Sequence, residues 1–361
     1  MKILVISLAG IGDTLFATPL IHELRANFLD ATIDALVLWR GSKDLLEGNP
    51  HLNSVHQKNL IADSKTGSLK FLAELRRARY DVSINTFPQS RIHYRLVARI
   101  IGAKTRISHN YECSGARDKL LVNKTIPQDY SLHAVDNNLA LLPLLGAETK
   151  LPEHSYEIFL ADAENTWADN FIAREKLSGR PLLGIHTGSG GTKNLALRRW
   201  PLENHIELVR RLRQQKPELA ILLFGGPEER ADQEKINSEL GGENLFFPKT
   251  ENLRQAAALI GKCDLFLSVD TPLMHVAAAM KVKRQIVIET PTWNRPIEPY
   301  GNPFTLVKNP AVAGRNLEFY RYDGHGIRGS PEELLRCMKS IRVESVAAAV
   351  ETAADNEHLT G

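Results

Sequence analysis

Short runs of apolar residues alternate along the chain with glycine-containing turns and amphipathic segments. The runs Leu265–Val269 and Gln285–Ile288 flank an apolar helix that is predicted over Met274–Met280. Uninterrupted apolar runs of this length are typical of parallel strands that are buried on both faces. Lys2–Leu8 and Pro181–His186 have the same character, and a glycine-containing turn follows each of them. The pattern therefore predicts an α/β protein with parallel sheets.

The same criteria predict the remaining elements. Further strands are expected at 32–37, 80–85 and 220–224. Helices are expected at 15–27, 42–47, 68–79, 92–101, 133–145, 161–177, 202–215, 253–260 and 330–341.

Two domains are predicted, because 361 residues exceed one ordinary core and both halves open with a strand, a glycine turn and a helix. A charged linker that contains Pro152, residues 148–157, precedes the boundary. We expect a first domain over 1–160, a second over 161–328, a last helix in 329–345 and a frayed tail over 346–361.

Composition narrows the class of protein. The hydrophobic fraction of 43% and the charged fraction of 24% are those of a soluble globular protein. Cys113, Cys263 and Cys337 are far apart, which argues against a disulfide framework and a cysteine zinc site and fits a reducing cytoplasm. No run approaches the ~20 apolar residues that span a bilayer. The net charge of +3 does not point to any partner, and we expect no nucleic acid.

The first glycine turn carries an acidic residue. Gly10 and Gly12 resemble half of a dinucleotide-binding fingerprint, but the third glycine is missing and Asp13 is negatively charged. The helix macrodipole stabilises such a carboxylate, which would nevertheless repel a pyrophosphate. This disfavours a dehydrogenase and predicts a carboxylate that accepts a proton or binds a hydroxyl in a cleft. The alternative is an aspartate that only caps the helix.

Basic residues accumulate in one part of the first half. Nine of them, but only two acidic residues, lie between Lys70 and Arg106. This bias predicts an acidic partner: phosphates, carboxylates of acidic sugars or an anionic membrane surface. Arg91 and Arg95 are the best candidates for contact, because they follow the strand that ends at Asn85. For any single residue, a solvated helix face is the simpler interpretation.

The second half contains a predicted anion site. The turn Thr187-Gly188-Ser189-Gly190-Gly191-Thr192 presents backbone N–H groups that suit phosphate oxygens. The guanidinium groups of Arg198 and Arg199 would neutralise a diphosphate without a metal, unless they are only loop charges.

Two further turns follow predicted strands of the second half. Glu228 and Glu229 stand where an acid binds ribose hydroxyls in dinucleotide folds. Asp270 and Thr271 stand at the end of another strand, with His275 in the first turn of the next helix. A phosphate site is predicted there, and the alternative is a capping aspartate with a core histidine.

These motifs together resemble glycosyltransferase family 9, the ADP-heptose:lipopolysaccharide heptosyltransferases. The similar segments are Gly10–Asp13 with Thr18-Pro19, 80–81, 102–107, 133–142, 186–189, 198–201 and 270–279, so the resemblance extends from about residue 1 to 345. It implies a GT-B fold: two Rossmann-like domains that face a central cleft, with the last helix crossing back to the first domain. The acceptor would bind the first domain and the nucleotide sugar the second.

The resemblance also implies roles for single residues. Asp13 matches the catalytic base, and Arg198 stands where the family usually has a lysine on the diphosphate. Glu228 or Glu229 falls at the ribose-binding acid, and Thr187, Asp270, Thr271 and His275 fall at phosphate-side positions. Two departures, Pro272 in place of a glycine and Glu289 in place of another, lie on the donor-sugar side.

The expected reaction is inverting transfer of a heptose from ADP-heptose to a lipopolysaccharide core acceptor, with no metal and no cofactor, since the chain has no Asp-x-Asp motif. The expected place is the cytoplasm, with peripheral contact to the inner membrane. Two alternatives remain: a transferase of the same fold that uses another nucleotide sugar for a different surface glycan, and a non-catalytic nucleotide- or glycan-binding protein.

Overall fold

The computed structural model describes residues 1–361 except 113, 190–194, 292–294, 313–328 and 359–361. The described chain divides into two compact units, residues 1–159 and residues 160 onward. Each unit contains a six-stranded sheet in which every recorded strand pair is parallel. The predicted α/β class with parallel sheets is confirmed.

The first unit alternates strands and helices. Its elements are β1 (Lys2–Ser7), α1 (Ile11–Leu15), α2 (Thr18–Asn27), β2 (Thr32–Val37), α3 (Arg40–Leu46), β3 (Ser54–Gln57), α4 (Lys65–Arg77), β4 (Val82–Asn85), α5 (Ile92–Ile101), β5 (Thr105–Asn110), α6 (Asp118–Leu121), β6 (Lys124–Pro127), α7 (Ala134–Leu139) and a 3₁₀ turn, Leu142–Leu145.

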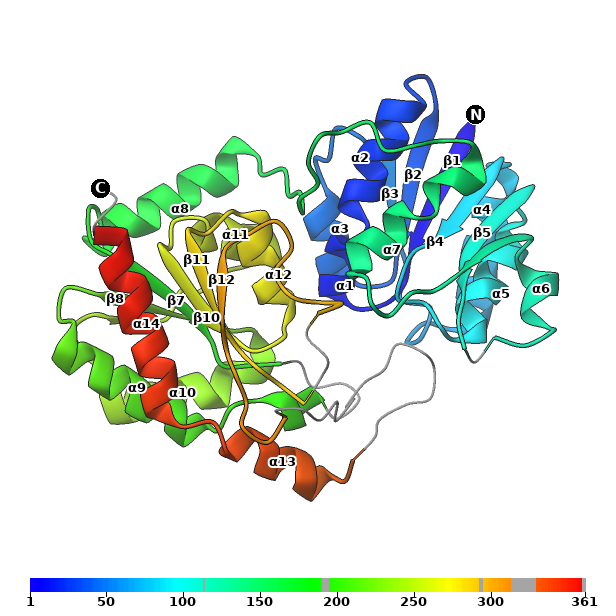
Figure 1. Ribbon diagram of the computed structural model, residues 1–361. Helices are drawn as coiled ribbons and strands as arrows, with labels where there is room; N and C mark the ends of the chain where they lie inside the picture. Colours follow the sequence, from blue (N-terminus) through cyan, green and yellow to red (C-terminus); the bar gives the residue numbers. More distant parts are fainter. Residues whose placement is uncertain (113, 190–194, 292–294, 313–328, 359–361) are drawn as a thin grey trace. The chain divides into compact units, whose positions relative to one another are not determined.

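The sheet of the first unit has the order β3-β2-β1-β4-β5-β6, so β1 lies at its centre. Side chains alternate between the two faces of a strand, and Leu4 and Ile6 of β1 join the same buried cluster as Leu72 of α4 and Ile101 of α5. Figure 1 shows α4 and α5 beside one face of this sheet and α2 and α7 beside the other. Helices therefore cover both faces, as the continuous apolar runs require.

The second unit repeats this plan. Its elements are α8 (Asp162–Arg174), β7 (Leu182–His186), a 3₁₀ turn (Leu195–Arg198), α9 (Leu202–Gln215), β8 (Ala220–Phe224), a 3₁₀ turn (Pro227–Glu229), α10 (Arg230–Leu240), β9 (Leu245–Phe246), α11 (Leu253–Ile260), β10 (Leu265–Ser268), α12 (Pro272–Ala279), β11 (Arg284–Ile288), β12 (Phe304–Val307), α13 (Pro331–Lys339) and α14 (Val343–His358).

The sheet of the second unit has the order β12-β11-β10-β7-β8-β9. One of its faces packs against α9, α10 and α14 in a single buried cluster that includes Ile185 of β7, Leu212 of α9 and Val350 of α14. In Figure 1, α8, α11 and α12 lie beside the opposite face. Helix α13 is the helix that was predicted within 329–345. Its predicted crossing back to the first domain is wrong, because α13 and α14 both group with the second unit and pack into its core.

The predicted tail is wrong. Residues 346–361 were expected to fray, but α14 runs from Val343 to His358. Val346, Val350 and Ala353 are at most 2% exposed. Their spacing of four and three residues places them on one side of a helix, and alanine has the highest helix propensity. The small residues of this segment therefore form a helix face that covers the sheet.

Other differences are smaller. The helix predicted over 15–27 is divided into α1 and α2, because Pro19 starts a new helical turn after Ala17. The strands β3, β5, β6, β9 and β12 and the helices α6 and α10 were not predicted. No helix in the described part of the chain combines the length and the apolar content that spanning a bilayer requires.

Candidate functional site

Predicted donor-side residues follow three neighbouring strands of the second sheet. Strand β7 lies between β8 and β10, and chain order runs outward from it in both directions. Such a point is where ligands bind in open α/β sheets, because the loops leave the sheet in opposite directions there. Thr187, Gly188 and Ser189 follow β7, while Asp270 and Thr271 follow β10. The structure brings the turns after β7 and β10 together.

A hydrogen bond joins the turns after β7 and β10. The Nδ1 atom of His186 lies 3.2 Å from Oγ1 of Thr271. Thr271 also caps α12, since its Oγ1 accepts from the Met274 N–H at 3.3 Å. Pro272 is the first residue of α12, where a missing N–H costs no helical hydrogen bond. The departure from the family pattern at Pro272 is therefore compatible with the helix.

A buried ion pair lies beside this contact. Arg198 and Asp270, 6% and 8% exposed, pair through Nη1 and Oδ2. Burial raises the pKa of Asp270, and the Arg198 guanidinium opposes that effect. The Nε2 atom of His275 is 3.9 Å from Oδ1 of the same carboxylate. Three residues predicted on the phosphate side thus form one charged cluster.

A second ion pair joins the turns after β7 and β8. Arg199 contacts Oε1 of Glu229 at 3.0 Å and Asp232 at 3.3 Å. Glu229 is 5% exposed, and a Cβ atom at Gly188 would lie 2.2 Å from its Oε1. A side chain at position 188 would therefore displace the Glu229 carboxylate from its pair with Arg199. Glu228 is exposed, so Glu229 is the acid that faces this turn.

Two buried histidines of the second unit stay neutral near pH 7. Burial, together with the charge of Arg199, lowers the pKa of His186 to about 3. Burial and His186 lower the pKa of His205 to about 3, and its ring packs edge-on against Trp200. Neither imidazole adds positive charge to the cluster at physiological pH, so the charge comes from the arginines.

These histidines predict loss of stability in acid. Each has a folded-state pKa below its unfolded value, so the unfolded chain binds more protons as the pH falls below about 6.5. We expect the second unit to lose about 1.4 kcal/mol per pH unit for each histidine between pH ~6 and ~4. Urea unfolding at several pH values measures this. His205→Gln should show a shallower slope, and an unchanged slope would contradict the assignment.

Asp13, the predicted base, lies in the first unit after β1. It is half-buried, and its Oδ2 accepts a hydrogen bond from the Gly10 N–H at 2.6 Å. This is the capping contact that was the alternative to a catalytic role, and it fixes the orientation of the carboxylate. Gly12 is buried in the same turn, next to Thr14, whose Oγ1 lies 2.8 Å from Oγ of Ser42.

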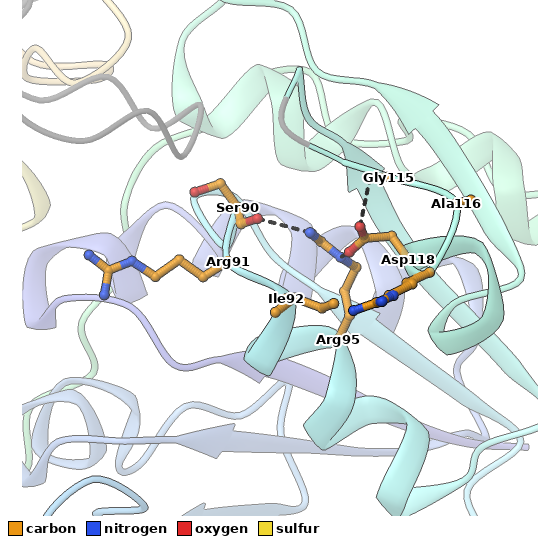
Figure 2. A pocket seen from close by; sticks show the side chains of 8 residues that line it. Ser90, Arg91, Ile92, Arg95, Gly115, Ala116 and Asp118 are labelled. Atoms are coloured by element: carbon orange, nitrogen blue, oxygen red, sulfur yellow. Dashed lines mark hydrogen bonds and ion pairs between the residues drawn. The ribbon is translucent and has the colours of Figure 1, made fainter.

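Arg91 and Arg95 lie together after β4, at a cavity of about 640 Å³. Arg95 is 2% exposed and pairs through Nε with Oδ1 of Asp118, while its Nη2 donates to the Ser90 carbonyl at 2.9 Å. In Figure 2 the side chain of Arg91 extends away from the Arg95–Asp118 pair. Arg95 was predicted as a direct contact, but most of its donors are engaged in holding this loop.

Sequence reasoning missed Arg117, which lines the same cavity. Arg117 and Arg91 are exposed, and neither guanidinium makes a hydrogen bond or ion pair to a residue in the described part of the chain. With Arg95 and Asp118 included, the cavity wall has three positive charges and one negative charge. The turn residues Gly190, Gly191 and Thr192 of the predicted nest lie outside the described residues.

Comparison with known proteins now decides the family. Residues 68–318 match the model of glycosyltransferase family 9 (heptosyltransferase), which covers parts of both units. The chain belongs to glycosyltransferase family 9. It is a glycosyltransferase, as the resemblance implied.

Relatives and solved structures agree with this family. Lipopolysaccharide heptosyltransferase 3 of Escherichia coli (strain K12) is 25% identical over 290 residues, 75% of this chain and 77% of that protein. Lipopolysaccharide heptosyltransferase 2 of Salmonella typhimurium (strain LT2) is 26% identical over 308 residues, 78% and 80% of the two chains.

Two solved structures share the fold. The family 9 glycosyl transferase from Veillonella parvula DSM 2008 has a TM-score of 0.78 at 20% identity and covers 98% of this chain and 96% of its own. The E. coli ADP-heptose lipopolysaccharide heptosyltransferase II has a TM-score of 0.74 at 21% identity, covering 99% and 100%. The predicted GT-B fold class, with two parallel-sheet domains, is confirmed.

Proposed function

We propose that this family 9 glycosyltransferase moves a heptose from ADP-heptose to a lipopolysaccharide core acceptor, with inversion and without a metal. The observation that carries the proposal is the cluster at the centre of the second sheet, where Arg198, Asp270 and Thr271 meet. The relatives named above are heptosyltransferases of lipopolysaccharide, and one similar structure is of an ADP-heptose enzyme.

The donor side of the reaction is proposed for the second unit. A nucleotide diphosphate develops negative charge as it leaves, and fixed cationic and N–H groups stabilise that charge most when they are oriented in advance. Arg198 is buried, and its pair with Asp270 fixes its guanidinium. Thr187 is also buried, and its Oγ1 has no hydrogen-bond partner among the described residues, so it is available for a phosphate oxygen.

The acid–base step is proposed for the first unit. Asp13 takes the proton from the acceptor hydroxyl as that oxygen attacks the anomeric carbon, and the bond from this carbon to the diphosphate oxygen breaks. The hydrogen bond from Gly10 orients the carboxylate before the acceptor arrives. Attack on the face opposite the leaving group inverts the configuration.

The acceptor is proposed to bind at the cavity after β4. Phosphates and sugar carboxylates, the anions expected of such an acceptor, are bound by arginine through two parallel hydrogen bonds. Arg91 and Arg117 have guanidinium groups without a partner among the described residues, and the buried Arg95–Asp118 pair holds the wall between them. The proposed partner is therefore an anionic glycolipid.

Removal of one exposed arginine tests this acceptor site. Arg117→Ala should raise the acceptor KM about five- to tenfold, since a charge-assisted hydrogen bond to an anion contributes on the order of 1–1.5 kcal/mol. The donor KM should stay unchanged. Steady-state kinetics with each substrate varied in turn measures both. Arg99→Ala, an exposed arginine of α5 that does not line the cavity, is the matched control. Equal effects of the two substitutions would exclude the cavity as the acceptor site.

A donor screen tests the function as a whole. Purified protein is supplied with a deacylated core acceptor and with ADP-heptose or a UDP-, GDP- or dTDP-sugar, and the product is analysed by mass spectrometry. Transfer from ADP-heptose supports the proposal. Transfer only from another nucleotide sugar would show that the enzyme uses that sugar as its donor and not ADP-heptose. Binding of ADP without turnover for any donor would make the chain a binding protein.

Two finer parts of the proposal have their own readouts. The anomeric proton coupling of the product reports inversion or retention. Activity in excess EDTA reports whether the transfer uses a divalent ion, and we expect no loss.

A further inference from the structure

Three potential metal ligands converge in the first unit, and none of them is a residue that the proposed reaction uses. His22 lies on α2, His51 on the loop after α3, and Glu157 in the segment after the turn at 142–145. The ligand atoms of these three side chains all lie within 4.8 Å of one another. The residues are 29 and 106 positions apart in sequence (51−22 and 157−51), so no spacing motif reveals them.

The glutamate faces both histidines. Its Oε1 lies 2.8 Å from Nδ1 of His22, and its Oε2 lies 3.8 Å from Nε2 of His51. Two ligand atoms that each lie about 2.1 Å from one ion are about 3.4 Å apart in a tetrahedral site. The two separations, each to a different oxygen of the carboxylate, lie on either side of this value, so small side-chain rotations bring one oxygen to both histidines. The three side chains are 16–30% exposed, so the site is shielded but reachable.

A second observation, an unpartnered carboxylate oxygen, favours cation binding at this cluster. Oε2 of Glu157 is buried and accepts no hydrogen bond from any described residue. Neither ring nitrogen of His51 has a hydrogen-bond partner there. A buried carboxylate oxygen without a partner is costly, and a bound cation removes that cost. Arg25 does not fill this role, because its guanidinium donates to the His51 carbonyl and to Asn53.

The surrounding chain holds the ligands in place. Glu23, fully buried, accepts from the backbone N–H groups of Lys150 and Leu151 and lies 2.8 Å from Nε2 of His154. The Glu157 N–H donates to Oγ1 of Thr18 at 3.1 Å. These bonds attach the segment from 150 to 157 to α2. The rings of His22 and His51 are stacked at 3.7 Å, so both must tilt for their lone pairs to meet at one ion.

We propose that His22, His51 and Glu157 bind one divalent transition-metal ion of the zinc type. Two imidazole nitrogens and one carboxylate are a ligand set that zinc accepts, with the fourth position open. A cavity of about 310 Å³ that His22, His154 and Glu157 line lies beside the site. The ion attaches the end of the first unit to α2 and takes no part in the glycosyl transfer proposed above.

The test uses the full chain without a histidine tag, stripped with a chelator and titrated with Zn²⁺ against a coloured competing chelator. One ion should bind per chain. His51→Ala and Glu157→Gln should each weaken Zn²⁺ binding at least tenfold. Mutation of residues that only hydrogen-bond to metal ligands already lowers metal affinity about 10- to 100-fold. His93→Ala, an exposed histidine of α5, is the matched control and should bind as the parent does.

Glu157→Gln keeps the size of the side chain, so it decides the question if His51→Ala does not fold. Hydrogen exchange with and without Zn²⁺ adds a local readout, because protection should rise over 150–157 in the parent and not in Glu157→Gln. X-ray absorption at the zinc edge should show nitrogen and oxygen neighbours. The site would be overturned if the parent protein bound Zn²⁺ no more tightly than Glu157→Gln does. Sulfur neighbours of the zinc in the absorption spectrum would also overturn it. Transfer activity is a separate measurement and does not depend on the outcome.

Discussion

Asp13→Asn should abolish most of the transfer activity while donor affinity stays nearly unchanged. Asparagine keeps an oxygen that accepts the hydrogen bond from Gly10, but it does not take a proton. The loss of a general base costs on the order of 10²- to 10⁴-fold in turnover. Single-turnover kinetics for kcat and calorimetry with ADP for donor binding measure the two effects separately.

The comparison with Asp13→Ala separates the two roles of this residue. If Asp13 only caps α1, Asp13→Asn should be active and Asp13→Ala should lose stability along with activity. If it is the base, both variants should be inactive to a similar degree. An active Asp13→Asn enzyme would therefore refute the catalytic assignment, whatever the alanine variant does.

Arg198→Ala should damage both stability and catalysis. Asp270 is 8% exposed, and removal of its partner leaves a buried carboxylate unpaired, which costs about 3–5 kcal/mol of unfolding free energy. Loss of one group that stabilises leaving-group charge costs roughly 10²- to 10³-fold in kcat. Urea unfolding and steady-state kinetics measure these losses.

The double variant Arg198→Ala with Asp270→Asn distinguishes the two effects. Neutralising Asp270 should restore much of the stability, because the buried charge is gone. Activity should stay low, because the cation that faces the diphosphate is still missing. Recovery of activity together with stability would mean that Arg198 acts only as a structural partner of Asp270.

The central parts of both sheets could be predicted from the sequence. β2 and β8 match the predicted ranges to the residue. Strands that are buried on both faces are rich in apolar residues: β8 is apolar throughout, and β2 has four apolar residues around the buried Asp34. The outer strands β3 and β6 contain polar residues and are partly exposed, so they give no such signal. These segments are strands because they hydrogen-bond to β2 and β5, and no local sequence pattern indicates them.

The site could be predicted from the sequence for a related reason. Parallel strands end at one edge of a sheet, so the turns after β7, β8 and β10 had to meet once those strands were identified. The ion pairs could not be predicted, since Arg198 and Asp270 are 72 residues apart in the sequence. The exposed Arg117 was also missed, because it follows no predicted element.

Helix α14 follows every strand of both sheets in the chain. The apolar surface of β10, β11 and β12 that it covers stays in contact with water until α14 has been synthesised. The strands of the first unit are synthesised long before that moment, whereas the second unit waits for this sixteen-residue helix. Products of premature termination near residue 340 should therefore bind chaperones or aggregate, although every strand of both sheets has already been synthesised.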